Sequence, residues 1–121
     1  MRSRQRSEED EARARLPLRP LEFAILLALA EEDLHGYGIA KRIAEREMGA
    51  VTLAPGNLYG VLDRLIADGL IERRRAGRES RRRAYRITPF GRRVAALEAA
   101  RLSAVVRTAK RLDLAPGRPT Q

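Results

Sequence analysis

The chemically capable side chains of this sequence gather between residues 52 and 93. Asn57 and Tyr59 follow a Pro55-Gly56 pair, and residues 71–93 contain ten arginines. An amide such as that of Asn57 can pair with the edge of an adenine, while tyrosine and arginine side chains can donate to phosphate. These residue types indicate hydrogen bonding and charge neutralisation, as in the binding of a polyanion.

Covalent and metal chemistry have few candidate residues. The 121 residues include no cysteine and one histidine, His35, so disulfides and thiolate sites are excluded and a histidine metal site is not expected. His35 lacks the serine and aspartate context of a catalytic triad, and we interpret His35 and Tyr37 as structural. We therefore predict no enzyme, no cofactor and no bound metal.

The formal net charge of +9 is unevenly placed. Residues 1–70 carry 10 basic against 12 acidic side chains, whereas residues 71–93 carry ten arginines against two glutamates, a net of +8. Residues 94–121 add five basic and two acidic side chains. A segment of one sign is the electrostatic footprint of a nucleic-acid partner. A merely solvated basic loop is the alternative, disfavoured because the segment follows the helix that carries Asn57.

That helix is predicted from Pro55 to Asp68, with Pro55 suited to the first turn and Gly69 to the exit. Its apolar stripe recurs at three- and four-residue steps and comprises Leu58, Val61, Leu62, Leu65 and Ile66. The other face would enter the major groove of DNA. The predicted DNA contacts on and before this helix are Thr52, Pro55, Gly56, Asn57, Tyr59, Gly60 and Arg64.

Several of these residues have structural alternatives. Asn57 could only cap the helix, and Tyr59 could pack on the strands that follow. Gly60 fits a close backbone approach to DNA, but helix packing explains it equally well. Arg64 is a phosphate ligand or the partner of Asp68, one turn later.

Two strands, Ile71–Arg75 and Arg83–Ile87, are predicted around a turn with Gly77 and Ser80. They would form a wing beside the helix. The arginines at and near its tip would reach phosphate or a narrow minor groove, and they are Arg78, Arg81, Arg82 and Arg83.

The segments before the helix are read from their apolar patterns. Residues 1–15 have almost no large apolar groups and are predicted to be a flexible arm. Pro20 begins a helix that is apolar nearly all round, so it would face both the core and a second subunit through Phe23, Leu26 and Leu27. Residues 31–38 are predicted as a turn before a second helix that ends near Gly49, and residues 51–53 as a brief strand.

A last helix is predicted from the Thr88-Pro89 cap to Leu112. Its heptad-like seam, interrupted by Glu98, is expected to dimerise through Ala95, Leu102, Val105, Ala109 and Leu112. The fold class is therefore mainly α with a small β wing: a winged helix-turn-helix over residues 16–88, a dimerisation helix over 89–113 and a flexible tail over 114–121. No apolar run approaches the roughly 20 residues of a membrane span, and no export signal is evident.

Five ordered motifs resemble the PadR family of bacterial transcriptional regulators: Leu34-His35-Gly36-Tyr37-Gly38-Ile39, Leu53-Ala54-Pro55-Gly56-Asn57-Leu58-Tyr59, Leu62-Asp63-Arg64-Leu65, Asp68-Gly69-Leu70-Ile71 and residues 83–91. The resemblance implies a homodimeric cytoplasmic repressor that binds a pseudo-palindromic operator in double-stranded DNA and is released by a small-molecule effector. The family more often has Ser-Pro-Gly-Thr where this chain has residues 54–57. The chain also lacks the tryptophan on which short multidrug-binding members stack drugs.

Winged helices serve other roles, so the fold alone does not decide the function. An RNA-binding or protein-interaction module is the main alternative, because the arginine segment suits RNA as well as DNA. Competition between duplex DNA and RNA discriminates these two possibilities. A metal-sensing winged helix is disfavoured by the missing thiols.

Overall fold

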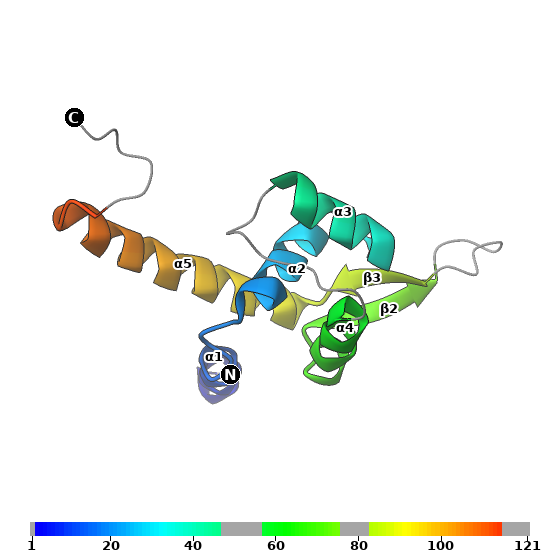
Figure 1. Ribbon diagram of the computed structural model, residues 1–121. Helices are drawn as coiled ribbons and strands as arrows, with labels where there is room; N and C mark the ends of the chain where they lie inside the picture. The colour runs from blue at the N-terminus through cyan, green and yellow to red at the C-terminus, as the bar shows by residue number, and fades with distance from the viewer. Residues whose placement is uncertain (1, 47–56, 76–82, 115–121) are drawn as a thin grey trace.

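The computed structural model describes residues 2–46, 57–75 and 83–114. Within these ranges the chain forms five helices and three strands (Figure 1). In chain order they are α1 (Arg2–Arg13), α2 (Pro20–Glu31), β1 (Leu34–His35), α3 (Gly36–Arg46), α4 (Asn57–Ala67), β2 (Ile71–Arg75), β3 (Arg83–Ile87) and α5 (Pro89–Arg111). None of the helices described is long and apolar enough to cross a membrane.

The three strands form one antiparallel sheet in the order β1-β3-β2. Strands β2 and β3 have the bounds predicted for the wing, and Ile71 pairs with Ile87 at its base. Strand β1 and the start of α3 at Gly36 lie where the sequence predicts a turn, so that prediction is wrong. Strand β1 exists because Leu34 pairs with Tyr85, a partner distant in the sequence. The strand predicted at residues 51–53 and the cap at Gly49 lie outside the described residues.

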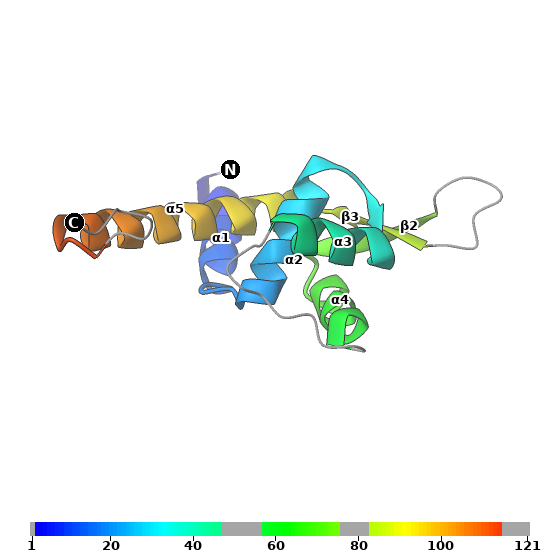
Figure 2. The same cartoon turned by 45° about the horizontal axis from the view of Figure 1, so that its top comes forward.

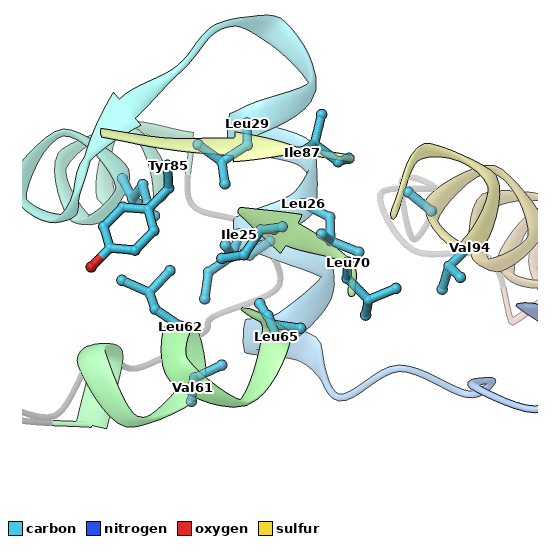
Figure 3. Packing of buried hydrophobic residues seen from close by; sticks show 14 of the residues in the cluster. Ile25, Leu26, Leu29, Val61, Leu62, Leu65, Leu70, Tyr85, Ile87 and Val94 are labelled. Atoms are coloured by element: carbon cyan, nitrogen blue, oxygen red, sulfur yellow. The ribbon is translucent and has the colours of Figure 1, made fainter. Parts of the chain in front are cut away.

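The hydrophobic core surrounds α2, which lies between α3, α4, α5 and the sheet (Figures 1 and 2). Figure 3 shows Ile25 and Leu26 of α2 among side chains from α4, β3 and α5. Leu26 has no solvent exposure within a single chain. Its prediction as a dimer-interface residue is therefore wrong, because the protomer's own core already covers it.

Helix α4 is fixed by burial on one side and by a defined end. Its predicted apolar stripe is buried at four positions, Leu58, Val61, Leu62 and Leu65. The helix ends as the sequence predicts at Gly69, whose φ of 78° is a left-handed conformation that glycine adopts without strain. The Leu70 amide donates to the Leu65 carbonyl at 2.9 Å, and the Gly69 amide to the Ile66 carbonyl at 3.0 Å. These are the two bonds of a Schellman motif.

Helix α5 begins directly against the end of α4. The Thr88 hydroxyl caps α5 by accepting from the Gly91 amide at 2.9 Å and donates to the Gly69 carbonyl at 2.6 Å. The Thr88 amide donates to the Leu70 carbonyl at 3.0 Å. At Gly91 the backbones approach so closely that an added Cβ would lie 2.0 Å from the Leu70 carbonyl oxygen. The start of α5 and the end of α4 therefore form one tightly packed junction.

The two halves of α5 have different surroundings. Val94, Ala95 and Glu98 are buried against the domain, so the prediction of Ala95 as a dimer contact is wrong for the same reason as that of Leu26. Beyond Glu98 the helix projects away from the other elements (Figures 1 and 2). There Val105 is 53 % exposed and Leu112 is 63 % exposed.

Helix α1 is a second departure from the sequence prediction, which treats residues 1–15 as flexible. Arg2–Arg13 form a helix that lies against α5. Ala12 has no solvent exposure, and the Glu9 carboxylate lies 2.9 Å from an Arg93 guanidinium nitrogen. Among the residues whose side chains are described, the buried methyl group of Ala12 and the long-range Glu9–Arg93 pair attach this helix, and neither leaves a periodic apolar pattern in the sequence.

Candidate nucleic-acid interface

The exposed face of α4 carries the polar side chains that sequence reasoning selected. Asn57, Gly60, Asp63 and Arg64 are exposed, while the opposite stripe is buried in the core. Asn57 is the first residue of α4, and its side chain makes no hydrogen bond to the residues that the structure describes. The amide is therefore accessible to a ligand that approaches the start of the helix.

Gly60 lies in the middle of this face and is not required by packing. No atom lies within 4 Å of the Cβ that any larger residue would add there. The alternative of helix packing is thus contradicted, and the surface over Gly60 is open. A flat backbone surface between Asn57 and Arg64 suits a close approach by a nucleic-acid backbone or base edge.

Tyr59 is 57 % exposed, and its ring lies over the first turn of α3. A Cβ added to Gly36 would lie 2.7 Å from the Tyr59 hydroxyl oxygen and 3.0 Å from two ring carbons. The ring therefore rests on Gly36 at the start of α3. Gly36 supports the position of Tyr59 by having no side chain.

Tyr37, the next residue after Gly36, is 79 % exposed. Its interpretation as structural is therefore not supported by burial, and it is a surface aromatic close in sequence to the support of Tyr59. Its position between two glycines at the start of a helix is the signal that could have identified it. His35 is half-buried, and its Nδ1 atom is buried without a hydrogen-bond partner among the described residues.

The arginines of the wing are partly neutralised at its base. Arg73 pairs with Asp63 of α4 at 2.9 Å, and Asp33 lies 2.9 Å from Arg74 and 3.2 Å from Arg86. The count of +8 over residues 71–93 overstates the charge available here, because Asp33 and Asp63 come from earlier in the chain. These pairs also fix the wing to α4 and to the segment after α2.

Arg64 has a different environment from these paired arginines. Asp68, its expected helical partner, instead contacts Arg15 at 3.3 Å. Arg64 is exposed and makes no ion pair with any other residue in the described ranges. The internal pairing considered from the sequence is thus absent, and the guanidinium is available to an anion.

The remaining predicted contacts fall largely outside the described ranges: Thr52, Pro55, Gly56, Arg78, Arg81 and Arg82. Arg83 is the first residue of β3, opposite Arg75. Across residues 2–46, 57–75 and 83–114 there is no group of three or more histidine, aspartate or glutamate side chains that could hold a metal ion.

The predicted dimer residues divide by exposure. Leu26 and Ala95 are buried, Phe23, Leu102 and Ala109 are half-buried, and Leu27, Val105 and Leu112 are exposed. Val106, which sequence reasoning did not select, is 39 % exposed on the projecting half of α5. The apolar surface open to a partner therefore lies mainly beyond Glu98.

Comparison with known proteins places this fold among bacterial regulators. The model of the transcriptional regulator PadR-like family matches residues 25–97. A PadR family transcription regulator from Clostridium difficile is similar with a TM-score of 0.69 and 23 % identity, covering 78 % of this chain and 98 % of that one. A transcriptional regulator from Clostridium thermocellum is similar with a TM-score of 0.64 and 28 % identity, covering 75 % and 87 % of the two chains.

A sequence relative is the uncharacterized 37.1 kDa protein in transposon Tn4556 of Streptomyces fradiae, which is 40 % identical over 85 residues. The match covers 68 % of this chain and 24 % of that protein, so the chain spans about a quarter of its length. Helix α1 lies before the segment that the family model matches, and the projecting half of α5 lies after it.

Proposed function

The chain belongs to the PadR-like family of transcriptional regulators, and from this premise we propose that it binds a pseudo-palindromic DNA operator as a homodimer and represses transcription. The exposed face of α4 is the observation that carries the proposal. An amide, an open glycine backbone and an unpaired arginine follow one another there, on a helix whose other face is anchored in the core. Such a helix fits the major groove, as the second helix of a helix-turn-helix does.

Two kinds of contact then set affinity and sequence choice. Arg64 and the wing arginines Arg78, Arg81, Arg82 and Arg83 neutralise phosphates, which gives affinity and salt dependence. Asn57 reads a base edge, with adenine as the favoured partner of an amide. Tyr59, supported on Gly36, contacts a base or donates to a phosphate beside it.

The second copy is supported by the projecting half of α5. Val105, Val106 and Leu112 expose apolar surface on a helix that has left its own domain. A coiled contact between two such helices would bury this surface and relate two α4 helices by a two-fold axis. The half-sites of the operator would then lie about one helical turn, or a multiple of it, apart. Release by a small-molecule effector and action at the nucleoid in the bacterial cytoplasm belong to the same proposal through the family resemblance.

The proposal is tested by selecting bound sequences from random duplex DNA and titrating variants against the selected operator. Asn57→Ala is expected to lose discrimination between operator and random duplex by roughly tenfold or more, as for one bidentate base contact. Arg64→Ala should weaken both duplexes alike and lower the salt slope by about one. Arg82→Ala tests the wing in the same way.

The matched control is Arg107→Ala, which removes the same charge from the projecting half of α5, far from α4 (Figure 1). If Arg64→Ala changes affinity and salt slope no more than Arg107→Ala does, α4 is not the DNA-contacting helix. A selection that returns no enriched sequence would contradict sequence-specific binding.

A further inference from the structure

We propose that residues 2–18 act as a positioning strut that fixes the angle between α4 and α5 and thereby sets the half-site spacing that the dimer reads. This inference depends on the proposed function. The segment, called the α1 strut below, touches both the end of the DNA-contacting helix and the buried half of the dimerisation helix. It precedes the residues that the family model matches.

The strut is attached to α5 at three points. The Glu9 carboxylate lies 2.9 Å from Arg93, and Ala12 is fully buried in the core cluster. The Leu18 amide donates to the Glu98 carboxylate at 2.8 Å. Glu98 is 1 % exposed and is the only charged residue among the buried ones described, and its other contacts come from Arg101 in the next turn. Glu98 interrupts the apolar seam of α5, and its carboxylate instead fixes the end of the strut at Leu18.

The attachment to α4 is a single ion pair at the end of that helix. Arg15 Nη1 lies 3.3 Å from Asp68 Oδ1, and the Asp68 amide donates to the Arg64 carbonyl at 2.9 Å. A guanidinium at this point also interacts favourably with the carboxyl end of the helix dipole. Arg15 therefore holds the turn that immediately follows the exposed face carrying Arg64.

Beyond the core that α4 and α5 share through α2, these contacts form the second direct connection between the two helices. The first is the junction at which Thr88 and Gly91 pack on Gly69 and Leu70. With one direct junction beside the shared core, rotation about that junction is the motion that a further connection can restrain most. The second connection meets α4 at Asp68, next to the junction, and reaches α5 at Arg93 and Glu98, two and seven residues beyond Gly91, so it braces α5 against that rotation. In a two-fold dimer the angle between α5 and α4 determines the separation of the two α4 helices, so the restraint acts on operator spacing.

The test exchanges the charges of the Arg15–Asp68 pair in the full-length chain. Arg15→Glu and Asp68→Arg each break the pair, and the double variant restores it in reverse with the wild-type net charge. The matched control is Arg19→Glu, which makes the same charge change four residues after Arg15, at a side chain that makes no ion pair with the described residues. Each protein is titrated with the selected operator, with random duplex, and with operators whose half-site spacing is one base pair shorter or longer.

Each single variant is expected to lower the ratio of operator to random-duplex affinity by up to about fivefold, the range of an exposed ion pair. It should also weaken the preference for the native spacing over operators one base pair shorter or longer. The double variant should recover both properties, and Arg19→Glu should retain them. Because net charge affects both duplexes alike, the ratio of operator to random-duplex affinity is insensitive to it. If a charge reversal impairs folding, Arg15→Gln replaces it, since this variant introduces no repulsion and should lower the same ratio.

Folded single variants that keep the wild-type ratio and spacing preference would overturn the strut. So would a double variant that shows no recovery, or a control that loses as much as Arg15→Glu. If the wild-type protein binds no duplex at all, the proposed function itself fails. That result differs from one in which the single variants bind the operator with the wild-type spacing preference, which overturns only the strut.

Discussion

Gly91→Ala should destabilise the protein severely, because it places a methyl group in the junction between α4 and α5. The new Cβ would lie 2.0 Å from the Leu70 carbonyl oxygen and 2.9 Å from Ile87 Cγ1. Atoms in ordinary contact lie about 3.5 Å apart, so the first turn of α5 must move by more than about 1 Å. That movement also strains the Thr88 hydrogen bonds to Gly69 and Leu70.

The size of the destabilisation by Gly91→Ala follows from opposing contributions to the free energy of unfolding. Overpacking costs about 1–3 kcal/mol, and each weakened hydrogen bond adds about 1 kcal/mol. Alanine returns up to about 1 kcal/mol because it is a better helix former than glycine. The expected net loss in the free energy of unfolding is about 2–4 kcal/mol, or a fall in Tm of roughly 10 °C.

Gly60→Ala is the matched control, because it is the same substitution in a helix at a position where no atom lies within 4 Å of the added Cβ. It should stabilise the protein by up to about 1 kcal/mol, while a methyl group on the exposed face of α4 should weaken operator binding. The assay is urea unfolding followed by far-ultraviolet circular dichroism at a fixed protein concentration, since a dimer's stability depends on concentration. A Gly91→Ala protein as stable as wild type would refute the close approach on which the junction depends.

Two further predictions address the site and the anchor of the strut. Gly36→Ala should displace the Tyr59 ring, which would change the near-ultraviolet signal of tyrosine and lower operator affinity. The free energy of unfolding should change little, because the ring is the mobile end of an exposed side chain. Unchanged spectra and affinity would contradict the assignment of Tyr59 to the interface. The Arg101 side chain and then the Leu18 amide lower the pKa of Glu98 below its ordinary 4.5, against the effect of burial. Its stabilising contribution is therefore complete above that pH and is lost as the pH falls through the lowered pKa. Acid unfolding curves should be flatter below pH 4.5 for Glu98→Gln than for wild type, and parallel curves would show that Glu98 carries none of the acid sensitivity.

The elements that the sequence predicts well are those with local signals at their ends. Gly69 marks the end of α4, and the Thr88-Pro89 pair marks the start of α5, because capping depends on residues within one turn. The strands β2 and β3 also follow from their own residues and the turn between them. The face of α4 was identified for the same reason, since its apolar stripe has helical periodicity.

The parts that the sequence does not predict depend on distant partners. Strand β1 is defined by pairing with β3, and two glycines in its neighbourhood favoured a turn instead. Helix α1 contacts Arg93 through Glu9, and Arg15 in the turn after the helix pairs with Asp68; both partners come more than fifty residues later. The apolar residues nearly all round α2 predict contact of Leu26 with a second subunit, but in a domain of this size the core surrounds such a helix.

The electrostatics of the site show the same division. Counting charges along the chain located the basic segment correctly, but Asp33 and Asp63 fold back onto Arg73, Arg74 and Arg86. Only the folded arrangement distinguishes these paired arginines from Arg64. Similarly, the sequence indicates that Glu98 interrupts a dimer seam, whereas its hydrogen bonds with Leu18 and Arg101 make it a buried attachment point.

The central claim is that two copies present α4 and the wing to duplex DNA, and titration of a labelled duplex over a salt series, with unlabelled RNA as competitor, tests it most directly. The account predicts tight binding at moderate salt with two protomers per duplex. The logarithm of the binding constant should fall linearly with the logarithm of the salt concentration, with a slope that corresponds to several neutralised phosphates. Duplex DNA should displace bound RNA readily. A protein that remains a monomer and binds no duplex at moderate salt, or that prefers RNA, would contradict the account.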